Sequence, residues 1–188
     1  MGLEKVPQRI FLDTSSLNFI LEHGDCIFDN IVVSDEELER RTVEDISAFN
    51  NIFSVGERAM WQIAVSPFTH SEIIKTQDAK KLHYLKGWFM DVWDYWNTIL
   101  EENNDFPSFA EAERMKIEIL SSGILDILPD VEDRMLICDA AAYKCDYFCT
   151  RDWRTILKHR EHLISLPVKM ITPTEWWNLI KPLAALWK

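Results

Sequence analysis

Short apolar runs alternate with longer amphipathic stretches along the chain. Four of the short runs have the length and the β-branched or aromatic content of buried strands: residues 9–12, 63–66, 147–150 and 168–172. A further apolar run, residues 124–128, ends at Pro129. Strands that alternate with helices predict an α/β fold, in which a parallel sheet is covered by helices on both faces.

The longer stretches predict the main helices. After Asp13, polar side chains including Asn18 are available to cap a helix whose apolar residues lie at 17–21. From Asp35 onward, apolar residues recur at helical spacing beside an acidic, solvated face. Residues 84–100 form a broad apolar stripe rich in tryptophan, which we expect to bury most of its indole rings.

The predicted start of the next helix determines how Glu72 is interpreted. Because Pro67 interrupts the second apolar run, Thr69 or Ser71 is predicted to cap a helix that begins around Glu72. A glutamate in a first helical turn also complements the helix dipole, so this position alone does not establish a function.

Acidic and basic residues mark two helices in the last third of the chain. Asp130 or Asp133 is predicted to open a helix through residue 141, and Asp139 is expected on a different, solvated face of that helix. A basic helix is predicted over residues 153–163. Its basic side chains can form a solvated surface or contact phosphate groups, and the sequence leaves both alternatives open.

Charge divides the chain into unequal parts. The 188 residues carry a net charge of −11, with −7 on residues 1–60, −7 on residues 61–132 and +3 on residues 133–188. A hydrophobic content of 47% excludes a disordered acidic chain. The overall acidity argues against simple electrostatic binding of nucleic acid, and the basic last part is the exception.

Localisation and redox state follow from what the sequence lacks. No apolar run approaches the ~20 residues of a membrane helix, and the first residues lack the apolar run of a secretory signal, so we expect a cytoplasmic protein without membrane contact. The four cysteines are then expected to be free thiols. Zinc at Cys145, Cys149, His159 and His162 is disfavoured because the two cysteines flank a strand.

Four acidic residues follow predicted strands or open helices: Asp13, Glu72, Asp133 and Asp152. In a parallel sheet these positions converge at the edge formed by the carboxyl ends of the strands. Clustered carboxylates repel one another unless a cation lies among them, and Mg²⁺ or Mn²⁺ prefers such oxygen ligands. The chemistry best suited to this set is phosphodiester hydrolysis.

Four segments make the chain similar to the PIN-domain nucleases: Phe11-Leu12-Asp13-Thr14-Ser15-Ser16-Leu17, Thr69-His70-Ser71-Glu72-Ile73, Asp133-Arg134-Met135-Leu136-Ile137-Cys138-Asp139-Ala140, and Tyr147-Phe148-Cys149-Thr150-Arg151-Asp152. The resemblance covers the start and the last third of the chain. It implies a three-layer α/β/α fold with a roughly five-stranded parallel sheet, formed by a single domain over residues 1–188. Residues 25–60 and 78–125 are longer than in compact toxin-type members and would be helical elaborations.

The resemblance also implies the chemistry of the site. Asp13, Glu72, Asp133 and Asp152 would bind one or two Mg²⁺ or Mn²⁺ ions and cleave single-stranded RNA, with Thr150 and Ser15 as supporting polar residues. Beside them, Arg151, Arg154 and Lys158 are candidate RNA contacts, and Trp153 could stack on a base or be buried in the core.

Three further readings compete with a housekeeping nuclease. The chain could be a PIN-like RNA-binding or scaffold protein without catalysis, or a toxin held inactive by an antitoxin partner. Homodimers are frequent among PIN-like proteins. A phosphoacceptor of the response-regulator kind ranks lower, because no acidic pair follows the first strand and no matching lysine is evident.

Overall fold

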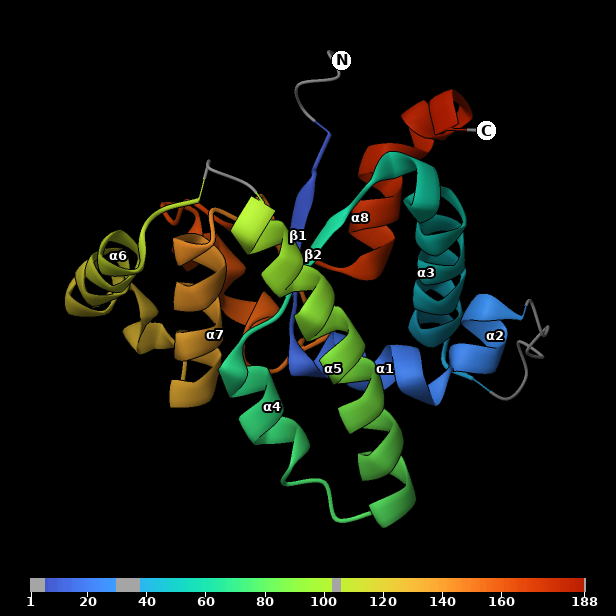
Figure 1. Ribbon diagram of the computed structural model, residues 1–188, viewed down its shortest axis with the longest axis horizontal. Coiled ribbons are helices and arrows are strands. Elements are labelled where there is room, and N and C mark those ends of the chain that lie inside the picture. The colour runs from blue at the N-terminus through green and yellow to red at the C-terminus, as the bar shows by residue number, and fades with distance from the viewer. Residues whose placement is uncertain (1–5, 30–37, 103–105, 188) are drawn as a thin grey trace.

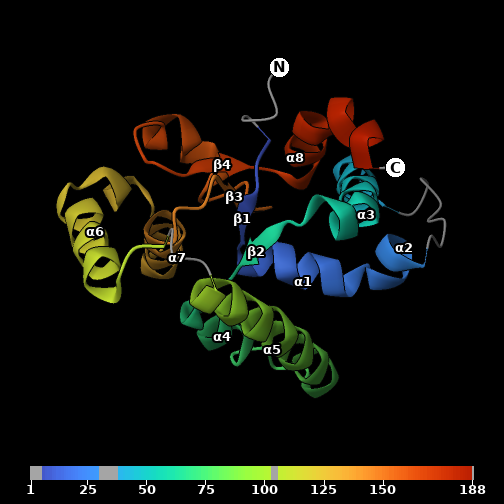
Figure 2. The same ribbon diagram turned by 45° about the horizontal axis from the view of Figure 1, so that its top comes forward.

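A four-stranded parallel sheet forms the middle layer of the fold in this computed structural model, which describes residues 6–29, 38–102 and 106–187. Its strands are β1 (Arg9–Leu12), β2 (Gln62–Ala64), β3 (Tyr147–Cys149) and β4 (Lys169–Ile171), in the order β2-β1-β3-β4. In the register, Ile10 lies opposite Ile63 on one side and Tyr147 on the other. β1 and β2 lie side by side (Figure 1), and the chain reverses its direction of winding at β1, between β2 and β3 (Figure 2).

Helices account for most of the described chain. They are α1 (Thr14–Glu22), α2 (Gly24–Phe28), α3 (Arg40–Ala59), α4 (Pro67–Ile73), α5 (Ala79–Glu102), α6 (Phe109–Ser121), α7 (Val131–Ala142) and α8 (Pro173–Ile180), with 3₁₀ helices η2 (Ile124–Ile127), η3 (Leu157–Leu163) and η4 (Lys181–Trp187). The predicted α/β class with an all-parallel sheet between helices is confirmed. The helix expected from Asp35 onward begins at Arg40, and residues 35–37 lie outside the described part of the chain.

Alternate strand residues face two separate hydrophobic cores. Ile10 and Leu12 point into the core shared with α1, α3 and α8, whereas Phe11 points into the core shared with α7. The rings of Phe11 and Phe148 stack on that second side, with centroids 5.3 Å apart. This two-residue alternation gives the three layers visible in Figure 2, where α3 and α8 lie on one side of the sheet and α6 and α7 on the other.

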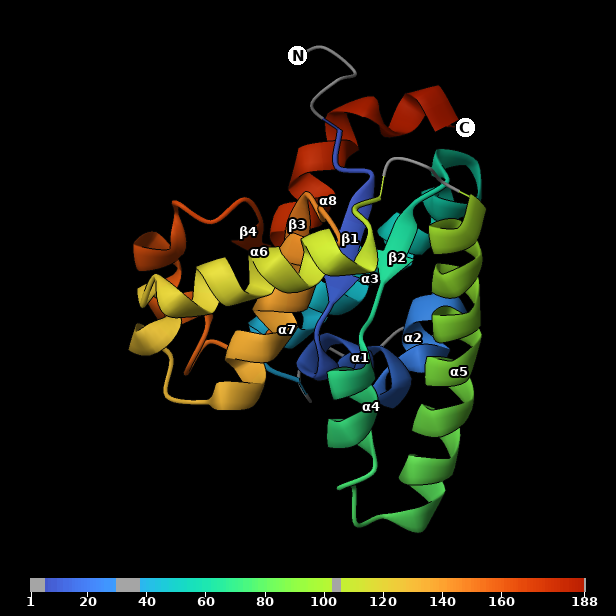
Figure 3. The ribbon, with the colours of Figure 1, turned by 60° about the vertical axis from the view of Figure 1, so that its left-hand side comes forward.

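The long helix α5 covers the edge of the sheet beside β2. Its Phe89 belongs to the first core and its fully buried Trp96 to the second, so the tryptophan-rich stripe is largely a core feature, as predicted. Figure 3 shows α5 as an outer layer with one side turned away from the rest of the chain.

Two sequence predictions about secondary structure were wrong. The sheet has four strands and not the roughly five that the resemblance implies, because the apolar run at residues 124–128 forms the 3₁₀ helix η2 after Gly123, a residue with a φ of 74°. The basic segment at residues 153–163 forms turns followed by the 3₁₀ helix η3 instead of an α-helix. Arg154 and Lys158 therefore do not share an α-helical face, although both are exposed.

The solvated position predicted for Asp139 was also wrong. Asp139 is 1% exposed, and the Lys116 ammonium on α6 lies 2.6 Å from its carboxylate. Burial raises the pKa of Asp139, and hydrogen bonding to Lys116 opposes that rise. Because α6 packs against α7, the buried Asp139 carboxylate is paired with the ammonium of a lysine that is distant in sequence.

The four cysteines are free thiols, as predicted. Cys26, Cys138, Cys145 and Cys149 are free, and all but Cys26 are buried. Within the described ranges, none of the helices combines the length and the apolar character needed to span a membrane.

Candidate active site

A cavity of about 350 Å³ lies at the carboxyl ends of the strands, where α1, α4 and α7 gather (Figure 3). Its lining residues are Asp13, Thr14, Ser15, Asn18, Glu72, Asp130, Asp133, Leu136, Asp152 and Thr155. The structure therefore brings together all four acids selected from the sequence, although they come from positions 13 to 152.

Asp13 sits at the centre of this arrangement. It directly follows β1, caps α1 by accepting a hydrogen bond from the Ser16 backbone N–H at 2.8 Å, and is 3% exposed. Its Oδ2 also accepts hydrogen bonds from the hydroxyls of Thr150, at 2.6 Å, and Ser15, at 2.8 Å. Burial raises the pKa of Asp13, and these hydrogen bonds oppose the rise.

Thr150 and Ser15 also orient the loop that carries Asp152. The Thr150 hydroxyl accepts a hydrogen bond from the Asp152 backbone N–H at 3.0 Å, and the Ser15 hydroxyl accepts one from the Arg151 backbone N–H at 3.0 Å. Because β1 and β3 are adjacent strands, their polar ends meet and the two hydroxyls link the Asp13 carboxylate to this loop.

The Thr155 hydroxyl links the carboxylates of Asp133 and Asp152. The single proton of the Thr155 hydroxyl is shared between Asp133 Oδ2, at 2.9 Å, and the Asp152 carboxylate. Asp152 also accepts hydrogen bonds from the backbone N–H groups of Arg154 and Thr155, both at 2.8 Å. Asp130 caps α7 by accepting from the Glu132 N–H, which leaves the Asp133 side chain available to the cavity.

The predicted start of the helix around Glu72 was wrong. Ser66 caps α4 and Pro67 occupies its first turn, because proline, which disrupts a helix interior, is favourable there. Glu72 therefore lies in the last turn of α4, where the helix dipole disfavours a carboxylate. A favourable interaction with the helix dipole therefore cannot explain a glutamate at position 72. Its carboxylate accepts a hydrogen bond from the Thr14 hydroxyl inside the cavity.

The cavity holds two acids with strongly shifted ionisation. Burial, together with the nearby charge of Asp13, raises the pKa of Glu72 to about 6, against the opposing hydrogen bond from Thr14. Burial and the charges of Asp130 and Asp152 raise the pKa of Asp133 to about 6. These shifts reflect carboxylates that are crowded and only partly solvated, so a cation placed among them would be stabilised.

Asn18 is a member of the site that the sequence did not single out. We expected it to contribute to helix capping, but the residue lines the cavity, and its buried side-chain Oδ1 has no hydrogen-bond partner within the described part of the chain. An acceptor buried without a donor is costly, and a bound cation or its water would satisfy it. Only its position on the helix that Asp13 caps could have indicated its place in this cavity.

The donor set fits a hard dication. The groups that face the cavity are carboxylate, hydroxyl and amide oxygens, and none of the four thiols lines it. In the described ranges, however, no three carboxylate, imidazole or thiol side chains are close enough together to form a ready coordination site. The zinc set of Cys145, Cys149, His159 and His162 is likewise not assembled.

Arg151 is already engaged elsewhere in the structure. Its guanidinium donates a hydrogen bond to the buried Asp45 carboxylate at 2.8 Å and lies 3.5 Å from the centre of the Phe19 ring. Asp45 also accepts from the Thr174 hydroxyl at 2.9 Å. Of the three basic residues selected from the sequence, Arg154 and Lys158 are the exposed ones.

Trp153 lies on the surface beside Asp152, with 43% of its area exposed. The Arg41 guanidinium on α3 lies 4.5 Å from the centre of its ring. Burial of Trp153 in the core, one of the two fates considered from the sequence, is therefore wrong.

Comparisons of this chain with family models, curated proteins and solved structures found no match.

Proposed function

We propose that this protein is a metal-dependent endoribonuclease of the PIN type that hydrolyses phosphodiester bonds of single-stranded RNA. The observation that carries the proposal is the convergence of Asp13, Glu72, Asp133 and Asp152 on one cavity at the carboxyl edge of a parallel sheet. Ligand and catalytic sites of open α/β sheets occur at this edge, where the winding direction reverses.

The chemistry of the lining supports the same proposal. Mg²⁺ or Mn²⁺ held by the four carboxylates would lower the pKa of a bound water and offset the charge that develops on the attacked phosphate. The raised pKa values of Glu72 and Asp133 indicate that the protein alone leaves this negative charge poorly compensated. The unpartnered Asn18 Oδ1 adds a neutral oxygen to the same set.

In this proposal the hydroxyl groups act as positioning residues. Thr150 and Ser15 hold Asp13, Thr155 holds Asp133 and Asp152, and Thr14 holds Glu72. A fixed carboxylate geometry lowers the reorganisation needed when substrate and water are brought together. Arg154 and Lys158 lie after Asp152 on the exposed surface, where a phosphate backbone can be contacted.

The test is cleavage of a single-stranded RNA in the presence of Mn²⁺, with Asp13→Asn as the key variant. Asparagine is also a good N-cap, so this change retains the cap of α1 while it removes the charge. We expect the cleavage rate to fall at least about a hundredfold. A matched control is Asp126→Asn, whose side chain is 73% exposed and pairs with Arg134 away from the cavity.

Two results contradict the proposal. One is an Asp13→Asn protein that is folded and cleaves RNA as fast as the unchanged chain. The other is RNA binding without any cleavage under Mn²⁺ or Mg²⁺, the result expected of a PIN-like RNA-binding protein without catalysis.

A further inference from the structure

The helix α5 presents a long exposed face, although the Tyr95 hydroxyl donates a hydrogen bond to the Trp61 backbone carbonyl at 2.8 Å. Its exposed positions recur every three or four residues and therefore form one stripe, which includes Lys80, Tyr84, Gly87, Met90, Asp94 and Tyr95. About half of the surface of each large apolar side chain is exposed: 55% for Tyr84, 45% for Met90 and 46% for Tyr95. We call this stripe the outer face of α5. Contiguous apolar exposure of this kind marks interaction surfaces.

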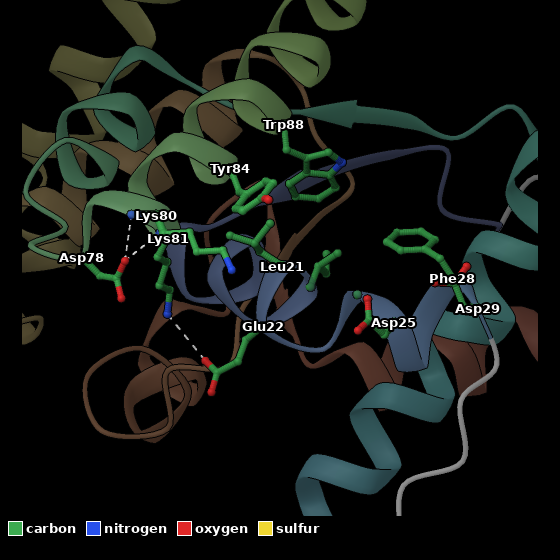
Figure 4. A pocket seen from close by; sticks show the side chains of 12 residues that line it. Leu21, Glu22, Asp25, Phe28, Asp29, Asp78, Lys80, Lys81, Tyr84 and Trp88 are labelled. Atoms are coloured by element: carbon green, nitrogen blue, oxygen red, sulfur yellow. Dashed lines mark hydrogen bonds and ion pairs between the residues drawn. The ribbon is translucent and has the colours of Figure 1, made fainter.

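Two hollows adjoin the outer face of α5, and both are lined by Tyr84 and Trp88. One, of about 620 Å³, lies between α5 and the α1–α2 segment, with Leu21 and Phe28 on its opposite side (Figure 4). The second, of about 560 Å³, is lined by Gly87 and Met90 in addition to the same two aromatic residues. The apolar surface is therefore grooved and can accept side chains from another molecule.

Gly87 lies in the middle of this face. Glycine is the least favourable residue in a helix interior after proline, and no described atom lies within 4 Å of the place a Cβ would take at Gly87. Packing within this chain thus gives no reason for a glycine there. A glycine does allow another backbone to approach closely, as at the crossing point of two packed helices.

The charged side chains of α5 are basic before Gly87 and acidic after it. Lys80 and His83 lie seven and four positions before it, and Asp94 and Asp91 lie seven and four positions after it. When the helix is paired with an antiparallel copy of itself across Gly87, Lys80 faces Asp94 of the second copy and His83 faces Asp91 of the second copy. A parallel pairing would place Lys80 against Lys80 and Asp94 against Asp94.

We propose that the outer face of α5 is a homodimer interface, in which two copies of the chain pack antiparallel across a two-fold axis at Gly87. In this arrangement Lys80 lies near Asp94 of the second copy, and Tyr84 packs near Met90 of the second copy. A crossing angle of about 20° keeps these pairs within reach over the length of the helix. The self-complementary charge pattern identifies the occupant as a second copy, because a two-fold interface uses the same patch on both subunits. This inference does not depend on the nuclease proposal.

The test uses charge reversals on the full chain, with molar mass measured over a range of concentrations. The unchanged protein forms a dimer. Asp94→Lys alone and Lys80→Asp alone each place like charges together at both symmetric contacts and weaken the dimer at least about tenfold. An equimolar mixture of these two variants restores dimer formation as a heterodimer, because every contact then pairs a lysine with an aspartate.

A second variant tests the crossing point independently. Gly87→Gln adds a good helix former in open space, so the monomer keeps or raises its melting temperature while the dimer is weakened at least about tenfold. Glu118→Lys, an equal charge reversal on the exposed surface of α6, leaves dimer formation unchanged. A protein that is monomeric up to millimolar concentration overturns the proposal, as does a dimer that tolerates both single reversals.

Discussion

The hydroxyl of Thr150 lies 2.6 Å from the carboxylate of Asp13, although the two residues are separated by most of the chain. The same hydroxyl accepts a hydrogen bond from the backbone of Asp152. One uncharged side chain, which is fully buried, therefore fixes two acids of the cavity and joins the ends of β1 and β3. Its removal is expected to disturb stability and site geometry together.

Thr150→Val keeps the shape of the side chain but removes its donor. We expect the free energy of unfolding to fall by about 2 kcal/mol at pH 7, because Asp13 stays buried with one hydrogen bond fewer. Urea denaturation measures the change. Ser54→Ala, which removes an exposed hydroxyl of α3, should stay within about 0.5 kcal/mol, and an equally small effect of Thr150→Val would contradict the expectation.

Glu72 makes the stability of the metal-free protein depend on pH. Its folded pKa of about 6 lies above the ordinary value of 4.5, so the folded state binds more protons between these values and stability falls as pH rises through this window. Glu72→Gln should therefore stabilise the metal-free protein by about 1 kcal/mol at pH 7.5, allowing for solvent screening, and should bring no gain near pH 4. Equilibrium denaturation at both pH values tests this, with Glu101→Gln as the exposed control.

Added Mn²⁺ should stabilise the protein at neutral pH. At a concentration one hundred times the dissociation constant, binding to the folded state alone adds about 2.7 kcal/mol, which appears as a higher melting temperature. Asp133→Asn removes one proposed ligand and should lose most of this gain, whereas Glu118→Gln on the surface of α6 should keep it. An equal rise in all three proteins would place the bound ion outside the cavity.

The positions of the acids at strand ends could be predicted from sequence, but several of their surroundings could not. The short runs Ile10–Leu12 and Tyr147–Cys149 are apolar, as buried parallel strands require, so the convergence of Asp13 with Asp152 follows from topology. Pro67 was misinterpreted because a proline that breaks a strand also suits the first turn of a helix. This misinterpretation of Pro67 placed Glu72 at the start of a helix, whereas it lies in the last turn of α4.

Buried polar residues were the second source of error. Asp139 is paired with Lys116, and Asp45 with Arg151, by contacts between segments that are remote in sequence. A local pattern identifies such residues only as charged and so predicts that they are solvated. The Asn18 acceptor without a donor is likewise visible only once the cavity around it is assembled.

Arg151 is expected to matter for stability more than for RNA contact. Arg151→Met leaves the Asp45 carboxylate buried with the Thr174 hydroxyl alone, which should lower the free energy of unfolding by about 3 kcal/mol. The double variant Arg151→Met with Asp45→Asn should recover a large part of that loss, because the uncompensated charge is then gone. Denaturation of both variants measures it. If the double variant is no more stable than Arg151→Met, the ion pair is not the cause.

The central position of β1 in the sheet also has a consequence for synthesis of the protein. β1 leaves the ribosome before its neighbour β3, because Thr150 follows Asp13 by 137 residues. At about 5–20 residues per second, Asp13 waits about 7 to 27 seconds for its partners. A nascent or truncated chain that ends before β3 therefore lacks the assembled cavity, so the proposed nuclease would be inactive until β3 has been translated.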